Sequence, residues 1–204
     1  MIRIKICGIT HIDDALQACA CGADALGLVL YEKSPRCVTR EQARAIVAAL
    51  PPFVTTVGLF VNESPETIRE IVDVCGLDVI QLHGDEGPEA CLFPPHRVRK
   101  ALRVRGEESL AGVEHFSVSA LLLDAWHPES YGGTGQLGDW TLAARLAAER
   151  PVILAGGLNP ENVAEAIRQV RPYGVDVSSG VESSPGCKDP ALVAAFIRNA
   201  RAAL

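Results

Sequence analysis

Residues 2–10 read IRIKICGIT, and this stretch predicts both a strand and the place of a reactive group. Apolar and polar residues alternate, which is the pattern of a β-strand. Gly8 breaks the strand, and Thr10 can cap a following helix through its side-chain oxygen. Cys7 shares a strand face with Lys5, because side chains alternate between faces. We therefore expect Cys7 at the carboxyl end of the first strand, as a catalytic thiol or as a small buried side chain.

The alternation of strand and helix patterns continues along the chain. Further apolar runs that fit strands occur at residues 23–30, 53–61, 78–82, 97–102, 120–124, 151–154 and 173–177. Helical patterns follow at residues 39–50, 86–93, 107–115 and 140–150, and they start at Ser64, Asn159 and Asp189. A capping box at residues 39–42 and a cap followed by proline at the three named starts support these helices.

Eight strand-then-helix units without a linker predict one α/β domain over residues 1–204. Near-continuous apolar strands between helices favour a parallel sheet that is covered on both faces. Eight units favour its closure into a compact (β/α)8 TIM barrel. An open doubly wound sheet is the alternative, but it normally uses fewer strands. A GxGxxG dinucleotide motif is also absent after the first strand.

The composition excludes several classes of function. The net charge is −6, whereas a nucleic-acid-binding domain usually carries a basic stripe. The apolar runs are too short for a membrane span, and the start of the chain does not fit a signal peptide. The seven cysteines are odd in number, contain no CxxC pair and have no zinc-site spacing with histidine. We expect free thiols in a cytoplasmic protein that binds no metal.

The active site of such a barrel lies at the carboxyl ends of its strands, which selects further candidates. Asp124 closes a run of three leucines, where its carboxyl group can donate a proton or can cap the next loop. His83 follows the fourth strand, as a base or as a hydrogen-bonded structural residue. Arg36 follows the second strand, where it can pair with a substrate carboxylate or lie in solvent. Asn62 follows the third strand.

Glycines at the ends of the last two strands point to an anion. Gly156 and Gly157 follow the seventh strand, and Ser179 and Gly180 follow the eighth. Glycine lets backbone N–H groups approach an anion closely, and these two loops are the usual phosphate site of the fold. Ordinary turns are the alternative. The glycine-rich residues 132–135 form a loop that can close over a ligand.

Together these segments resemble the phosphoribosylanthranilate isomerase family of tryptophan biosynthesis. The matching segments span the chain in the family's order: KICGIT (5–10), SPR (34–36), GLFVN (58–62), QLHG (81–84), LD (123–124), GGTG (132–135), LAGGL (154–158) and DVSSGVE (176–182). One departure is Gly138, where the family usually has an aromatic residue before Asp139. Because this position joins a loop to a helix, it bears little on the chemistry.

The resemblance implies an Amadori rearrangement of a phosphorylated small molecule, without a cofactor or a metal. N-(5'-phosphoribosyl)anthranilate becomes 1-(2-carboxyphenylamino)-1-deoxyribulose 5-phosphate, the third step from chorismate to tryptophan. It implies Asp124 as general acid and Cys7 as general base. Independently of the resemblance, Lys5 lies two residues before Cys7 on the same strand face and is a candidate for lowering the pKa of the thiol. The implied substrate-binding residues are Arg36 for the anthranilate carboxylate, Gly156, Gly157, Ser179 and Gly180 for the phosphate, and His83 and Asp176. The implied assembly is a monomer or a homodimer.

Two alternative functions remain. The related sugar isomerase of histidine biosynthesis runs the same rearrangement on a substrate with two phosphates. That family is similar in fold, but its barrel has an aspartate where this chain has Cys7. It also usually carries a second phosphate loop where this chain reads Asn62-Glu63-Ser64. A non-catalytic phosphate-binding barrel would keep the glycine loops but would not require Cys7 and Asp124 at the mouth.

Overall fold

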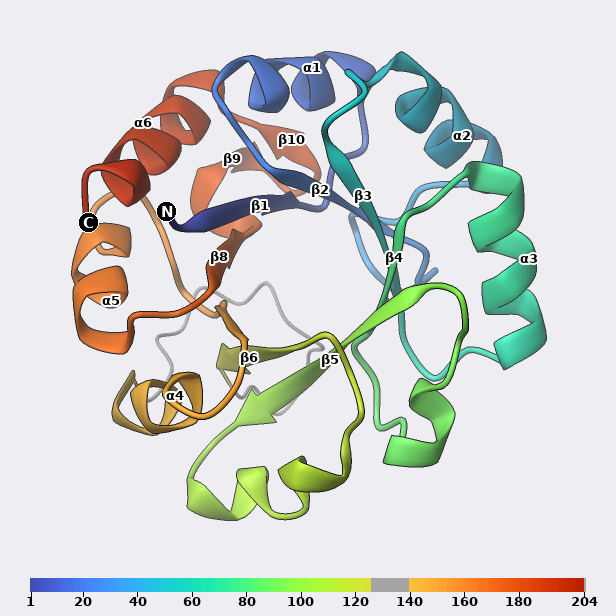
Figure 1. Ribbon diagram of the computed structural model, residues 1–204. Coiled ribbons are helices and arrows are strands. Elements are labelled where there is room, and N and C mark those ends of the chain that lie inside the picture. Colours follow the sequence, from blue (N-terminus) through green and yellow to red (C-terminus); the bar gives the residue numbers. More distant parts are fainter. Residues whose placement is uncertain (126–139, 204) are drawn as a thin grey trace.

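The computed structural model describes residues 1–125 and 140–203, and its main strands form a closed parallel barrel (Figure 1). Each strand pairs with the next, and the last pairs with the first, with Lys5 opposite Asp176. The strands are β1 (Arg3–Cys7), β2 (Ala25–Val29), β3 (Thr55–Phe60), β4 (Val79–Leu82), β5 (Arg97–Val104), β6 (Ala120–Ala125), β7 (Val152–Leu154) and β8 (Gly174–Val177). The expected (β/α)8 barrel is confirmed.

The α-helices surround the barrel and cover the outer face of its strands (Figure 1). They are α1 (Ile12–Ala20), α2 (Arg40–Ala49), α3 (Pro65–Cys75), α4 (Trp140–Ala147), α5 (Val163–Val170) and α6 (Pro190–Arg201). The outward residues of the strands, such as Ile4, Ile6 and Phe60, pack with helix residues such as Phe196 in one apolar core. In the described part of the chain, no helix has the length and apolar character that crossing a membrane requires.

Most expected helix starts are present. Thr39 and Gln42 form the capping box of α2, and Ser64 accepts a hydrogen bond from the Thr67 amide at the start of α3. Asp189 accepts hydrogen bonds from two amides of α6. Asn159 also accepts from two amides, but it caps a turn that precedes α5.

The predicted Thr10 cap is wrong. His11 occupies the N-cap position of α1 and makes no side-chain hydrogen bond there. The Thr10 hydroxyl donates instead to the carbonyl of Gly186, on a loop that is 176 residues away in the chain. This long-range partner competes with the local cap and could not be seen in the sequence around Thr10.

The helices expected after the fourth and fifth strands are 3-10 turns. Residues after β4 form η1 (Pro88–Cys91), and those after β5 form η2 (Glu107–Leu110) and η3 (Val113–His115). Gly112 between η2 and η3 has a φ of 76°, which an α-helix does not tolerate. A second departure is the antiparallel hairpin of β9 (Glu182–Ser184) and β10 (Cys187–Lys188), which follows the 3-10 turn η4 (Ser179–Val181).

The interior of the barrel combines small apolar clusters with buried polar and charged side chains. Ala25, Val57 and Val79 form a small apolar cluster. Lys5, Gln81 and Asp176 are also buried. The face that Cys7 shares with Lys5 is therefore the barrel interior, which positions charged groups directly beneath the mouth.

Candidate active site

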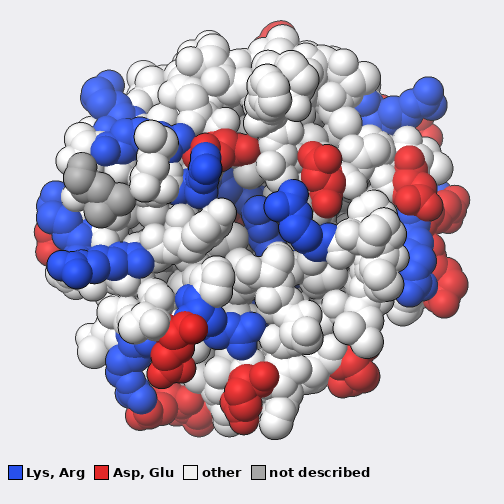
Figure 2. All heavy atoms as spheres, viewed as in Figure 1, with Lys and Arg blue, Asp and Glu red and all other residues white. Residues whose placement is uncertain are grey.

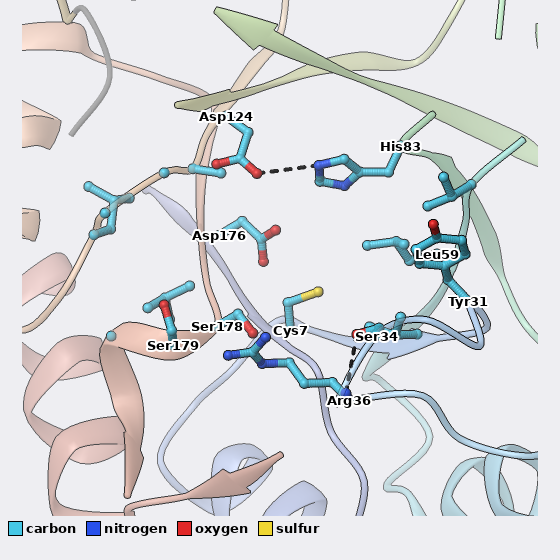
Figure 3. Close-up of a pocket in the computed structure, with 18 residues that line it drawn as sticks. Cys7, Tyr31, Ser34, Arg36, Leu59, His83, Asp124, Asp176, Ser178 and Ser179 are labelled. Carbon is cyan, nitrogen blue, oxygen red and sulfur yellow. Dashed lines mark hydrogen bonds and ion pairs between the residues drawn. The ribbon is translucent and has the colours of Figure 1, made fainter. Parts of the chain in front are cut away.

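One pocket at the carboxyl ends of the strands brings the predicted site residues together (Figure 3). The nine predicted residues that line it are Cys7, Arg36, His83, Asp124, Gly156, Gly157, Asp176, Ser179 and Gly180. Asn62 is not among the lining residues, since its side-chain oxygen accepts a hydrogen bond from the Asp85 amide on a neighbouring loop. The predicted closing loop at 132–135, like Gly138 and Asp139, lies outside the described residues.

Cys7 ends β1 with its sulfur directed into the pocket (Figure 3). Beneath it lies the Lys5 ammonium, whose Nζ is 2.9 Å from Asp176 Oδ2 on β8. Burial raises the pKa of the Cys7 thiol, and Lys5 opposes this effect without overcoming it. Lys5 therefore acts in the expected direction, but the net pKa of Cys7 is above its ordinary value.

Asp124 is the penultimate residue of β6, on the opposite side of the pocket, and faces His83 of the loop after β4 (Figure 3). His83 Nε2 lies 3.3 Å from Asp124 Oδ2, close enough for an ion pair but without the alignment of a hydrogen bond. The other ring nitrogen, Nδ1, lies 3.2 Å from Gln81 Nε2. With the Gln81 amide as donor, Nδ1 accepts and the proton of a neutral ring lies on Nε2, facing Asp124.

Arg36 reaches the pocket from the loop after β2, and it is neither solvated nor free. Its Nε and Nη2 donate to the two oxygens of Glu182 at 2.8 and 2.7 Å. Lys188 Nζ donates to the same carboxylate at 2.7 Å. Nη1 is thus the guanidinium nitrogen that Glu182 leaves available for a ligand.

Glu182 and Lys188 are functional candidates that sequence reasoning missed. Burial alone would raise the pKa of Glu182, but the hydrogen bonds from Arg36 and Lys188 outweigh it, so the pKa is lowered and Glu182 is ionised. Glu182 is the last residue of the DVSSGVE segment (176–182), and that segment was the sequence signal that could have identified it. Lys188 had none, because it lies on a hairpin that the sequence pattern did not predict.

The glycine loops form the remaining side of the pocket. Gly156 and Gly157 have φ values of 78° and 66°, which other residues rarely adopt. Gly180 packs on the first loop so closely that a Cβ atom would lie 2.0 Å from the Leu158 carbonyl oxygen. The hydrogen bonds of the described residues leave the N–H groups of Gly157, Ser179 and Gly180 without an acceptor. These groups can therefore bind an anion.

Comparison with known proteins identifies the family. The sequence profile described as N-(5'phosphoribosyl)anthranilate (PRA) isomerase matches residues 4–199. The chain belongs to this isomerase family. Relatives named N-(5'-phosphoribosyl)anthranilate isomerase include one from Pelobacter propionicus, 56% identical over 98% of this chain and 96% of its own length. Another, from Geobacter sulfurreducens, is 55% identical over 98% of this chain and 99% of its own length.

Solved structures of phosphoribosylanthranilate isomerases share the fold. The enzyme from Thermotoga maritima superimposes with a TM-score of 0.93 at 45% identity, over 99% of this chain and 100% of that one. A phosphoribosylanthranilate isomerase in complex with reduced 1-(o-carboxyphenylamino)-1-deoxyribulose 5-phosphate gives a TM-score of 0.90 at 43% identity, with the same coverage. This isomerase is therefore an enzyme of the tryptophan pathway.

Proposed function

We propose that this isomerase converts N-(5'-phosphoribosyl)anthranilate into 1-(2-carboxyphenylamino)-1-deoxyribulose 5-phosphate, with Asp124 as the general acid and Cys7 as the general base. The single observation that supports these roles is the shared pocket of Cys7, Asp124 and the glycine loops in a chain of this family. An internal rearrangement needs one proton donor and one proton acceptor on different sides of the sugar, and it needs no external oxidant.

The first step opens the ribose ring. Asp124 donates a proton to the ring oxygen, and the bond between that oxygen and C1 breaks as the anthranilate nitrogen forms a Schiff base with C1. His83 lies against the Asp124 carboxylate and holds it toward the pocket. A positioned proton donor contributes about 10²–10⁴-fold to the rate.

The second step moves the hydrogen from C2. The Cys7 thiolate takes the C2 proton, and the electrons of that bond form the C1–C2 double bond of an enolamine while the iminium nitrogen becomes neutral. Tautomerisation of the enolamine gives the 2-ketone. In this tautomerisation C1 gains a proton and the C2 hydroxyl loses one. Cys7 holds the proton taken from C2 and Asp124 lacks the one it gave, so one proton released to C1 and one recovered from the hydroxyl return both residues to their starting forms.

The other lining residues bind the substrate in this proposal. The Arg36 guanidinium binds the anthranilate carboxylate through Nη1, while Glu182 fixes its orientation. The free amides of Gly157, Ser179 and Gly180, on loops shaped by Gly156, bind the phosphate. Asp176 Oδ1 is buried without a partner in the described structure, so it can accept a hydrogen bond from a sugar hydroxyl. His83 also contacts the sugar from the opposite wall.

The decisive test follows the fluorescence of N-(5'-phosphoribosyl)anthranilate as the purified chain consumes it. We expect rapid loss of substrate fluorescence with wild-type protein and none with a Cys7→Ala/Asp124→Asn double variant. The two-phosphate substrate of the histidine pathway is the specificity control, and we expect no turnover of it. Failure to consume the first substrate would rule out the proposed activity.

We further propose that the whole chain, residues 1–204, acts as one domain in the cytoplasm, as a monomer or a homodimer. The isomerase from Thermotoga maritima is a precedent for a homodimer, since a solved structure of monomers was made from that dimeric enzyme. This structure matches with a TM-score of 0.90 at 42% identity, over 99% of this chain and 100% of that one. Sedimentation of the purified chain distinguishes the two assemblies.

A further inference from the structure

We propose that Lys5 is a positioning residue that favours the thiolate of Cys7, and that Asp176 limits this effect by sharing the charge of Lys5. The proposal rests on the proposed role of Cys7 as the general base. It adds a function for a buried ammonium group that the two proton transfers do not use.

The geometry places the three groups close to one another inside the barrel. Lys5 is 3% exposed, and its Nζ lies 2.9 Å from Asp176 Oδ2. An ideal Cβ on Gly27 would lie 2.6 Å from Cys7 Sγ and 3.0 Å from Lys5 Nζ. Because both atoms are so close to one point above β2, the ammonium group is adjacent to the thiol as well as to the carboxylate.

Gly27 is the reason that this arrangement fits. The other residues of β2 on the same face, Ala25 and Val29, carry side chains into the barrel. At position 27, a Cβ would collide with both Cys7 Sγ and the Cε of Lys5, which is 2.9 Å from it. The absence of a side chain therefore leaves the volume that the thiol and the ammonium share.

Lys5 stays charged in this interior. Burial alone would lower its pKa, but Asp176 and Cys7 raise the pKa above its ordinary value. A permanent cation beside Sγ stabilises the thiolate electrostatically, whereas the Asp176 carboxylate opposes it. The attraction of Lys5 exceeds the repulsion of Asp176.

The other charged groups around Cys7 also have partners of their own. Arg36 and Lys188 both face the thiol, but both also donate to the Glu182 carboxylate. His83 and Asp124 face it from the opposite wall and interact with each other. Lys5 is thus the cation whose removal changes the potential at Sγ most, and Lys188 contributes less.

The experiment measures alkylation of Cys7 by iodoacetamide as a function of pH, with mass spectrometry to resolve the modified cysteine. The reagent reacts with thiolates, so at pH values below the pKa of the thiol the reaction rate reports the fraction of thiolate. Wild type is compared with Lys5→Met, Asp176→Asn and the double variant. Cys21, which lies beyond the end of α1, is the internal control in every sample and is expected to react at an unchanged rate.

The variants are expected to change the rate of Cys7 alkylation in different directions. Lys5→Met is expected to slow Cys7 alkylation at pH 8 by roughly tenfold, which corresponds to one unit in the midpoint. Asp176→Asn is expected to accelerate it. The double variant, in which the neutral pair keeps a similar volume, is expected to react more slowly than wild type because the Lys5 effect is the larger one.

This pattern separates electrostatics from loosening of the fold. A loosened barrel would expose the thiol and accelerate alkylation in all variants, whereas the proposal requires acceleration in one and slowing in two. If Lys5→Met does not fold, the double variant tests the same point. Wild-type rates in either Lys5 variant would overturn the proposal. Retained turnover in Cys7→Ala would instead remove the base role, and would leave the alkylation result intact.

Discussion

The two ends of the barrel both carry cationic side chains, but only one end is organised for catalysis. At the amino end, a cavity is lined by Arg3, Arg97 and Arg99, and Figure 2 shows basic side chains gathered near the middle of one face of the molecule. Burial lowers the pKa of Arg99 there. At the carboxyl end, Arg36 and Lys188 are fixed by one carboxylate.

The comparison teaches that positive charge does not define this site. The carboxyl end combines a proton donor, a proton acceptor, an oriented guanidinium and free backbone amides within one pocket. The amino-end cavity has guanidinium groups but no comparable acid–base pair facing them among its lining residues. Variants at the two ends should therefore differ greatly in their effect on turnover.

The largest effect is expected from the proposed acid and base. Cys7→Ala and Asp124→Asn should each lower kcat by about 10²–10⁴-fold, because each removes one proton-transfer group. Steady-state kinetics with the fluorescent substrate measures this. Thermal unfolding of the same samples is the control for folding, and near-normal kcat in a folded variant would remove that residue from its role.

The pH dependence of Cys7 alkylation in the wild type should show a comparably steep change. The rate of reaction with iodoacetamide follows the thiolate fraction, so it rises with pH by about tenfold per unit below the pKa of the thiol. Burial raises that pKa, which moves the rising limb to higher pH. We expect the alkylation rate still to increase at the ordinary thiol pKa of about 8.5. A plateau of the rate well below that pH would contradict the raised pKa of Cys7.

Gly180→Ala tests the phosphate loops. The added Cβ would meet the Leu158 carbonyl oxygen at 2.0 Å, so one of the two loops must shift. Displacement of the amides is expected to lower kcat/KM by roughly 10–100-fold, as misplaced binding groups do. Gly76→Ala is a control at another glycine, the C-cap of α3 with a φ of 69°, where strain affects stability but not substrate binding. Equal kcat/KM for Gly180→Ala and wild type would separate Gly180 from the phosphate.

Arg36→Met is expected to act mainly on binding. Loss of one charge-assisted hydrogen bond costs about 1.5–3 kcal/mol, so KM should rise by roughly tenfold or more while kcat changes less. The measurement is KM for N-(5'-phosphoribosyl)anthranilate. An unchanged KM would refute the carboxylate role.

The smallest effect is expected at the amino end. Arg99→Met removes a partly desolvated guanidinium that lines the amino-end cavity and not the active-site pocket. Its kcat and KM should stay within about threefold of wild type, and the free energy of unfolding should change by no more than about 1 kcal/mol. A rise in KM as large as that expected for Arg36→Met would abolish the contrast between the two ends.

The sequence by itself was sufficient for the barrel and for most of the pocket. Alternation in IRIKICG sets the two faces of β1, and the carboxyl-end rule then selects Cys7 and Asp124 as neighbours across the mouth. Local signals also located α2, α3 and α6, because their caps bond to amides only two or three residues away. Hydrophobic periodicity and helix caps depend on residues that are near one another in the chain, so they can be recognised from the sequence without a structure.

Only the tertiary structure decided which groups pair. Thr10 donates to Gly186, 176 residues away in the chain, and does not cap the following helix. Arg36 and Lys188 both bind Glu182, which is 146 residues from Arg36. Likewise, Lys5 and Asp176 are 171 residues apart, and they are brought together because β8 closes the barrel against β1. Charges in a buried interior interact strongly with whatever the closure places beside them, and strand order alone does not determine those partners.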